Sequence, residues 1–126
     1  MAPDRKTTGR RGEDAACEYL LNAGHMIIER NWRASHLETD IITLYKDGIH
    51  FVEVKTRNAP TTADPECNVT EQKIKRMTAA ARRFLLGRDS APFRDAELFF
   101  DVITVIFEGD RAEIEYYPQA FIPIYV

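Results

Sequence analysis

The sequence lacks several features that would assign it at once to a class of protein. Its apolar runs cover only a few residues, far short of the roughly 20 that a membrane-spanning helix needs. The basic N-terminal stretch MAPDRKTTGRRGED has no apolar segment of the kind found in secretory signals. Internal repeats and low-complexity segments are also absent. These absences favour an ordinary globular protein with no membrane association.

Cysteine is scarce, and its two occurrences lie far apart in the chain. Cys17 and Cys67 have neither the spacing of a zinc site nor the density of a disulfide scaffold. Free thiols fit this pattern better, which indicates a cytoplasmic protein. The length of 126 residues suits a single domain over residues 1–126. Within it, residues 1–7 are expected to be disordered, and residues 57–69, with two prolines, to form a mobile loop.

The net charge of −3 hides an uneven distribution of charged residues. Residues 73–94 contain seven Lys or Arg residues against one acid, Asp89, whereas residues 95–126 contain seven acids against Arg111 alone. A run of like charge is most often the solvated face of a helix. A basic element near a group of carboxylates also suits a nucleic-acid-binding protein, despite the acidic total.

Hydrophobic periodicity and turn signals predict the element order α-β-β-β-α-β-β. Helices are expected over residues 8–23 and 71–86, with Gly24 ending the first and Thr70 capping the second. Strands are expected over residues 25–32, 38–45, 49–56, 97–107 and 112–117. The pair Asp47-Gly48 predicts a tight hairpin between the second and third strands. This order is typical of an α/β (α+β) fold with a mixed central sheet flanked by helices.

Glu13 falls on the apolar stripe of the first expected helix, together with Ala16, Cys17 and Leu20. A carboxylate on a buried stripe needs a partner, a metal ion or a cleft. Alternatively, a position near the start of the helix can reach solvent, where a negative charge also interacts favourably with the helix dipole. The sequence supports the two interpretations about equally.

The hairpin segment LETDIITLYKDGIHFVEVKTR carries charges within its most apolar stretches. Strand alternation puts Glu53 and Lys55 on one face of their strand, and Asp40 lies on the neighbouring strand. If the faces coincide, Asp40 and Glu53 repel each other unless a cation or a proton lies between them. Oxygen ligands of this kind suit Mg²⁺, and a nearby lysine could stabilise charge on a phosphate. The alternative is a cross-strand salt bridge from Lys55 on an exposed sheet face.

Asp40 followed by Glu53-Val54-Lys55 resembles the metal site of the PD-(D/E)XK nucleases, which have the restriction-endonuclease-like fold. A longer similarity, over roughly residues 8–121, is carried by GRRGEDAACEYLLNAG, RNWR, LETDIITL, FVEVKTR, VTEQKIKRMTAAARRFL and FFDVITV. Together these segments resemble the YraN family of small bacterial proteins, which are similar to Holliday-junction resolvases. The resemblance implies a three-layer nuclease-like fold and a Mg²⁺ or Mn²⁺ cofactor.

The resemblance also implies roles for individual residues. The implied catalytic residues are Asp40, Glu53, Lys55 and Glu13. The implied metal ligands are Asp40, Glu53 and the backbone carbonyl of Val54, with Glu38 as an additional acid. Three positions depart from the family pattern, because Leu37, Thr39 and Phe99 stand where Gly, Ile and Arg are usual. The missing arginine removes a candidate phosphate or carboxylate contact, which bears on the choice of substrate.

Three functions are compatible with the sequence. The first is a metal-dependent endonuclease acting on DNA, for which a branched substrate would suit a homodimer. Its expected phosphate contacts are Lys73, Arg76, Arg83, Arg10, Arg11 and Arg57. The second is a nucleic-acid-binding module with weak or no cleavage. The third is a protein-interaction domain that would use the acidic tail with Tyr116, Tyr117, Phe121 and Tyr125.

Overall fold

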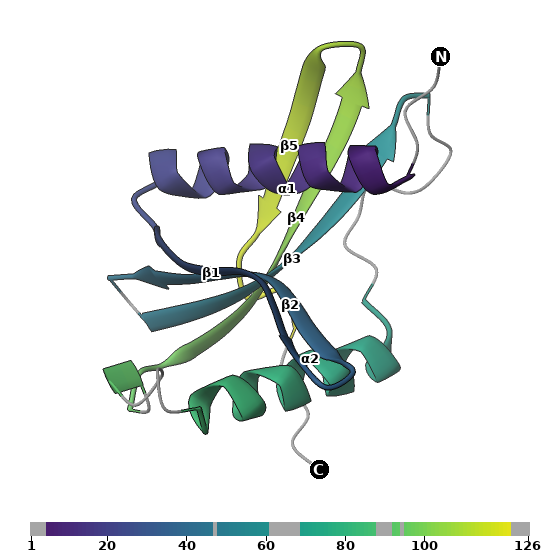
Figure 1. Ribbon diagram of the computed structural model, residues 1–126. Coiled ribbons are helices and arrows are strands. Elements are labelled where there is room, and N and C mark those ends of the chain that lie inside the picture. The colour runs from purple at the N-terminus through teal and green to yellow at the C-terminus, as the bar shows by residue number, and fades with distance from the viewer. Residues whose placement is uncertain (1–4, 47, 61–68, 88–91, 94, 122–126) are drawn as a thin grey trace.

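A computed structural model describes residues 5–46, 48–60, 69–87, 92–93 and 95–121 of the chain. Its elements are α1 (Arg5–Asn22), β1 (Met26–Ala34), β2 (Leu37–Tyr45), β3 (Gly48–Asn58), α2 (Glu71–Leu85), β4 (Leu98–Glu108) and β5 (Arg111–Tyr117). The two helices lie on opposite sides of the sheet (Figure 1). The predicted α-β-β-β-α-β-β order is confirmed.

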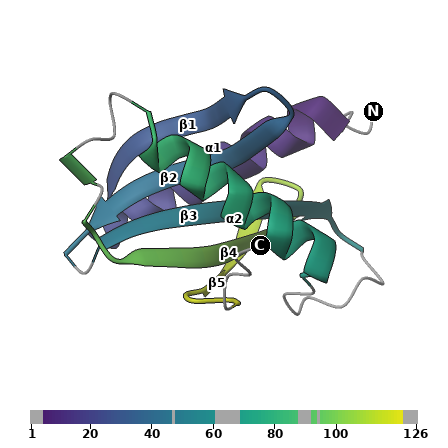
Figure 2. The same ribbon diagram turned by 90° about the horizontal axis from the view of Figure 1, so that it is seen from below.

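The five strands form one mixed sheet in the order β1-β2-β3-β4-β5. All neighbouring pairs are antiparallel except β3 and β4, which are parallel. Parallel neighbours need a crossover connection, and here the connection contains α2. The crossover places α2 over one face of the sheet, while α1 covers the other (Figure 2).

Two hydrophobic cores fill the spaces between the helices and the sheet, because successive strand residues point to opposite faces. On the α1 face the buried core contains Ala16, Cys17, Leu20, Ile41, Val52, Ile103, Val105 and Phe107. On the α2 face it contains Ile42, Ile49, Phe51, Met77, Ala81, Phe84 and Phe100. The sheet is therefore apolar on both sides, and charged side chains within it need a specific explanation.

The helix ends follow the expected local chemistry. The chain leaves α1 through Gly24, whose φ of +98° lies in the left-handed region that glycine adopts readily. The side chain of Thr70 caps α2 by accepting a hydrogen bond from the Lys73 N–H at 3.2 Å. Neither described helix is both long enough and apolar enough to cross a membrane.

Three expectations about local structure need correction. Helix α1 begins at Arg5 rather than at Thr8, so residues 5–7 are helical and not disordered. Strand β3 extends to Asn58, which places the first two residues of the expected 57–69 loop within the sheet. Strand β1 is Met26–Ala34 rather than residues 25–32, so it extends two residues further toward β2. Residues 1–4 and 61–68 lie outside the described residues.

The pairing of β2 with β3 ends part-way along both strands. Their ladder runs from the pair Tyr45 and Gly48, at the turn, to the pair Ile41 and Val52. On its other edge β2 pairs with β1 along almost its whole length, so beyond Ile41 these two strands form an arm that leaves the rest of the sheet. Asp40 and Glu53 are the next residues after the final pair, so they lie where the strands diverge.

A buried polar network lies on the other half of the sheet face that α1 covers. Asp101 Oδ2 lies 2.5 Å from His50 Nδ1 and accepts a hydrogen bond from the Tyr116 hydroxyl, also at 2.5 Å. The backbone N–H of Gln119 donates to Asp101 Oδ1 at 2.9 Å. Because these contacts join β3, β4 and the residues after β5, they fix the strands at a distance from the point of divergence.

Candidate active site where β2 and β3 diverge

A hydrogen bond from backbone to side chain spans the gap between the diverging strands. The backbone N–H of Val54 donates to Asp40 Oδ2 at 2.9 Å. In an extended strand the N–H and C=O groups of one residue point to the same edge. The Val54 carbonyl therefore also points toward the gap, the position that the resemblance implies for a metal ligand.

Asp40 lies within a group of carboxylates. Burial, together with the nearby charges of Glu13, Glu53 and Glu38, raises its pKa from the ordinary 3.8 to about 6. The hydrogen bond from Val54 acts in the opposite direction, because it stabilises the charged form. A carboxylate that is disfavoured in its ionised form by three neighbouring acids is a suitable position for a cation.

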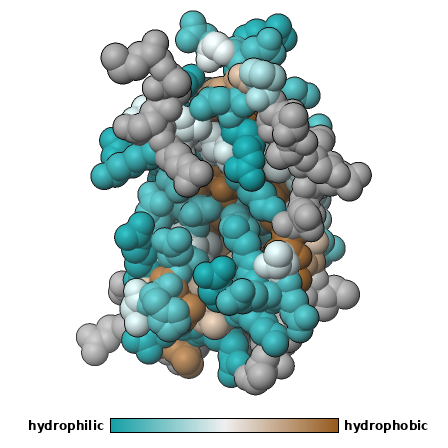
Figure 3. Space-filling view, turned by 90° about the vertical axis from the view of Figure 1, so that its right-hand side faces the viewer, coloured by the Kyte–Doolittle hydropathy of each residue, from teal (hydrophilic) through white to brown (hydrophobic). Residues whose placement is uncertain are grey.

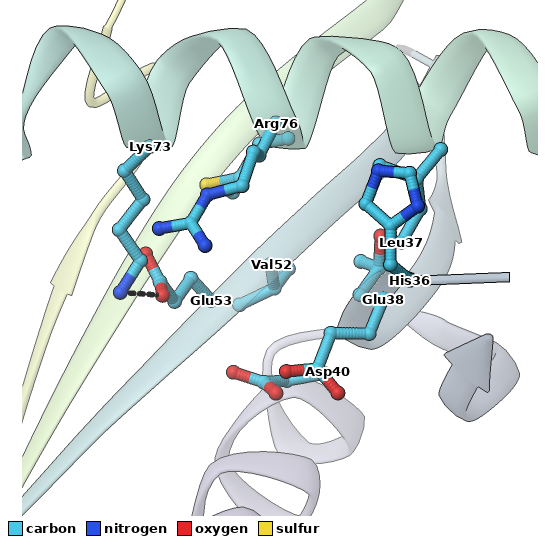
Figure 4. Close-up of a pocket in the computed structure, with 10 residues that line it drawn as sticks. His36, Leu37, Glu38, Asp40, Val52, Glu53, Lys73 and Arg76 are labelled. Atoms are coloured by element: carbon cyan, nitrogen blue, oxygen red, sulfur yellow. Dashed lines mark ion pairs between the residues drawn. The ribbon is translucent and has the colours of Figure 1, made fainter. Parts of the chain in front are cut away.

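Glu53 is the second carboxylate of the group, and its side chain is only 13% exposed. One of its oxygens, Oε1, forms an ion pair with the Lys73 ammonium from α2 (Figure 4). The other, Oε2, is buried and has no hydrogen-bond partner among the described residues. Because a buried charged oxygen without a partner is costly, Glu53 retains the capacity to bind a further ligand.

A first cavity of about 180 Å³ opens between α2 and the arm formed by β1 and β2. Its lining residues are His36, Leu37, Glu38, Thr39, Asp40, Val52, Glu53, Lys73, Arg76 and Met77. In Figure 4 the cationic side chains of Lys73 and Arg76 extend from α2 toward the strands that carry the acids. This cavity thus combines acidic oxygens with two cationic groups opposite them.

A second cavity, of about 740 Å³, lies on the α1 side of the same gap. It is lined by Thr8, Gly9, Glu13, Asp40, Val54, Thr56, Arg57 and Asn58. Asp40 lines both cavities and so connects them. Half-buried Glu13 faces this cleft, which agrees with the first of the two interpretations left open for it.

Comparison with known proteins places the chain in a family. The family model described as "Uncharacterised protein family UPF0102" matches residues 12–105. The chain belongs to the UPF0102 family. It is 41% identical to a UPF0102 protein of Nitratidesulfovibrio vulgaris (strain DP4) over 121 residues, which cover 96% of this chain and 88% of the relative. The resemblance to the YraN family is thereby confirmed.

Other UPF0102 relatives come from different bacteria. A UPF0102 protein of Bacteroides thetaiotaomicron is 40% identical over 116 residues, or 91% of this chain and 92% of the relative. One from Myxococcus xanthus is 36% identical over 118 residues, or 94% and 91% of the two chains. These relatives match this chain over almost their whole length, so the similarity includes every element that forms the two cavities.

The structure of this UPF0102 chain separates the expected site residues into two groups. Those lining the first two cavities are Glu13, Glu38, Asp40, Glu53, Val54, Arg57, Lys73 and Arg76. Half-buried Lys55 follows Glu53 on the same face of β3 but lines neither cavity. Exposed Arg83 lies further along α2, outside both cavities, and the Arg11 guanidinium packs over the Phe107 ring at 4.2 Å.

Sequence reasoning missed several residues around the gap. His36 joins the first cavity because the turn from β1 to β2 points toward α2, and Thr8 joins the second with a hydrogen bond from Asn58 at 3.2 Å. A third cavity, of about 490 Å³, is lined by Lys6, Gly9, Arg10, Glu13, Asp14, Arg30, Asn31 and Arg33. The β1 members of this set belong to the RNWR segment, which contributes to the family resemblance. The sequence does not place that segment beside α1, since its position depends on the pairing of β1 with β2.

The donor set suits a hard divalent cation rather than a fully enclosing metal cage. Across the described part of the chain, no group of three or more His, Cys, Asp or Glu residues is arranged to hold a metal ion. Mg²⁺ usually keeps several waters and needs only one or two protein carboxylates. The unpartnered Oε2 of Glu53, the carboxylate of Asp40 and the Val54 carbonyl meet that requirement.

The family arginine that Phe99 replaces would not lie in this site. Phe99 is buried and stacks on the His50 ring with the two centroids 4.6 Å apart. The replacement therefore fills an apolar layer next to the polar network. This position lines none of the three cavities, and the loss of a phosphate or carboxylate contact there stays a prediction.

Proposed function

We propose that this protein is a Mg²⁺- or Mn²⁺-dependent nuclease that cuts DNA phosphodiester bonds in the cytoplasm. The proposal depends chiefly on one observation. Asp40 and Glu53 lie near each other at the point where β2 and β3 separate. One buried oxygen of Glu53 has no hydrogen-bond partner among the described residues, and two cationic side chains of α2 lie opposite the carboxylates. Carboxylates that bind a cation, facing basic groups that bind a phosphate, are what phosphodiester hydrolysis requires.

In this proposal the metal ligands are Asp40, Glu53 and the carbonyl of Val54. When bound, the cation supplies charge stabilisation to the phosphate oxygens and lowers the pKa of a coordinated water. The side chains of Lys73 and Arg76 hold the phosphate in the first cavity by charge-assisted hydrogen bonds. These two residues thereby orient the scissile bond against the carboxylates.

Glu13 and Lys55 have supporting roles in the proposal. Glu13 faces Asp40 from α1 and adds negative charge, which favours cation binding in the gap. Lys55 follows Glu53 on the same face of β3, where its ammonium orients water or stabilises a phosphate once substrate is bound. A four-way junction would suit a homodimer, since its two-fold symmetry matches that of the dimer.

A second candidate function is a nucleic-acid-binding module that does not cut. The observation that favours it is the ion pair between Lys73 and Glu53, because an ammonium already neutralises one of the two expected ligands. The same cationic surface of α2 would then bind nucleic acid in a strongly salt-dependent way without hydrolysis.

A cleavage panel separates these functions. Linear, flapped and four-way-junction DNA would be incubated with Mg²⁺, Mn²⁺ or EDTA and the wild-type, Asp40→Ala, Lys55→Ala or Lys75→Ala protein. We expect metal-dependent cleavage by the wild type and the Lys75→Ala control, and a loss of at least about a hundredfold for the other two.

The same panel gives the opposing results. Cleavage at the wild-type rate by both Asp40→Ala and Lys55→Ala would show that the site assignment is wrong. Salt-dependent binding without cleavage of any substrate would favour the binding module. Equal rates on the junction and the linear duplex would exclude a preference for branched DNA.

A further inference from the structure

The N-terminal half of α1 carries charge of the sign that its dipole disfavours. Helix N-termini favour acids, and α2 follows that rule with Glu71 in its first turn and Arg82 and Arg83 in its last. Helix α1 has no acid in its first turn, while Lys6 and Arg10 lie four residues apart near its start. Like charges at this spacing also repel each other. A helix that gives up stability in this way commonly does so for function.

The same part of α1 opens directly onto the cavities around Asp40. A methyl group added at Gly9 would have no atom within 4 Å, so the helix surface there faces open space. Gly9 and Glu13 both line the second and the third cavity, which are therefore adjacent. Through Asp40, the second cavity also adjoins the first. The three hollows thus form one path from α2, past the acids, to α1 and β1.

Arginines from two strands add to the positive charge along this path. Arg57 of β3 lines the second cavity, and Arg30 and Arg33 of β1 line the third. Arg30 pairs with Asp14 at 2.7 Å and Arg33 with Glu38 at 3.4 Å, so both guanidinium groups are held in place. The second and third cavities together have five cationic and three acidic lining residues, whereas the whole chain has a net charge of −3.

The backbone of β1 is irregular where it supplies these arginines. A bulge shifts its register between Ile27 and Glu29, and Asn31 has a φ of +52°. Bulges re-aim side chains beside active sites, and asparagine tolerates the left-handed region better than most residues. The irregularity lies directly next to Arg30.

We propose that the α1 surface, defined as Lys6, Arg10, Arg30, Arg33 and Arg57, is a second phosphate-binding surface. It holds the DNA strand on the side of Asp40 opposite α2, so the substrate continues beyond the cut bond in both directions. This inference rests on the proposed function. In this inference the β1 arginines and Lys6 contact the phosphate backbone of the DNA, in addition to the contacts made by α2.

The test measures binding of labelled duplex and junction DNA in EDTA, where no metal-dependent cleavage occurs. In Lys6→Glu the new acid suits the helix dipole and can pair with Arg10, so we expect Tm to rise by about 1–3 °C. Its DNA affinity should nevertheless fall roughly tenfold, and the slope of log affinity against log salt should decrease in magnitude by about one or more. The matched control is Lys46→Glu, an exposed lysine at the turn between β2 and β3.

A second pair of variants changes the same position in two ways. Gly9→Glu introduces length and negative charge into the path, whereas Gly9→Ala adds only a methyl group in open space. We expect the first to weaken binding about tenfold and the second to bind as the wild type does. Both should fold, because each replaces glycine within a helix by a better helix former.

The outcomes distinguish this inference from the proposed function. If the wild type binds and cuts DNA while Lys6→Glu and Gly9→Glu bind with its affinity and salt slope, the α1 surface is not a binding surface and the nuclease stands. If both variants weaken binding while Lys46→Glu and Gly9→Ala do not, the inference holds. A wild type that neither binds nor cuts any DNA would overturn both.

Discussion

Asp40 illustrates at the scale of one residue how the site opposes folding. A raised pKa means that the folded protein binds a proton more tightly than the unfolded chain does. Between pH 4 and pH 6, approximately, the folded state therefore holds more protons, and its stability falls as the pH rises. Above that window, ionised Asp40 remains in a half-buried position among other acids and destabilises the fold.

We predict that Asp40→Asn stabilises the metal-free protein at neutral pH. Asparagine keeps an oxygen that can accept the Val54 hydrogen bond but carries no charge. The gain in free energy of unfolding should reach about 2–3 kcal/mol at pH 8 and disappear near pH 4. Urea unfolding at several pH values measures it, with Asp110→Asn as an exposed control. Parallel stability profiles for wild type and Asp40→Asn would contradict the account.

Lys73 provides a second prediction at this scale. Lys73→Met would leave both oxygens of Glu53 without a cation, so we expect a loss of about 1–3 kcal/mol in the free energy of unfolding. The control is Lys75→Met, because Lys75 forms an exposed pair with Glu71 on the same helix and should change stability by less than about 0.5 kcal/mol. Equal losses in urea unfolding would show that the ion pair with Glu53 has no special role.

Among the elements, the contact between α1 and β3 determines how close Glu13 lies to Asp40. A Cβ atom at Gly12 would lie 1.9 Å from the Thr56 hydroxyl oxygen, so the helix approaches the strand more closely than any other residue would allow. The position of the adjacent Glu13 therefore depends on how closely α1 approaches β3. The GRRGED segment therefore contains two glycines with different roles, one for packing and one that leaves open space.

Alanine substitutions at the two glycines should have opposite effects. Gly12→Ala must move Thr56 or the helix, and we expect it to lower the free energy of unfolding by about 1–3 kcal/mol. Gly9→Ala meets no atom within 4 Å and should raise it by about 0.5–1 kcal/mol, since alanine is the better helix former. Thermal or urea unfolding of both proteins checks this, and a shared sign would contradict the packing explanation.

The elements were largely predictable from local patterns, and the reason is physical. The alternation in β2 and β3 and the Asp47-Gly48 pair specify a hairpin, and its register makes Asp40 and Glu53 neighbours. Those patterns carry no information about where the ladder ends. The β2–β3 ladder ends after Ile41 and Val52 while β2 stays paired with β1 along its length, which is a property of the assembled sheet.

The molecule as a whole has one rigidly joined end and one open side. The network around Asp101 joins β3, β4 and the residues after β5. The N-terminal ends of α1 and α2, which lie near the site, are on the right-hand side of Figure 1. The space-filling view of that side is mainly hydrophilic, with apolar atoms visible in its hollows (Figure 3). The sequence predicts Arg10 and Arg57 as phosphate contacts, but the α1 surface as a whole could not be predicted from it, because the surface unites α1, β1 and β3 only after folding.

A whole-molecule prediction concerns the effect of metal on folding. Because a cation would bind the folded site and not the unfolded chain, Mg²⁺ or Mn²⁺ should raise the stability of the wild type. At ten times its dissociation constant the gain is about 1.4 kcal/mol, and EDTA should remove it. Asp40→Asn and Glu53→Gln should show little of this gain in thermal unfolding. An equal gain in all three proteins would indicate that the ion binds elsewhere.

The divergence of the strands has a mechanical consequence for the choice of ion. Asp40 belongs to the arm of β1 and β2, whereas Glu53 belongs to the body of the sheet, and the Val54 hydrogen bond crosses the gap between them. The separation of the two carboxylates therefore follows the angle of the arm, with a pivot near Ile41. A larger ion would increase the distance between the two carboxylates. Because Arg30 and Arg33 belong to the same arm, the radius of the ion would also determine where those arginines meet the DNA.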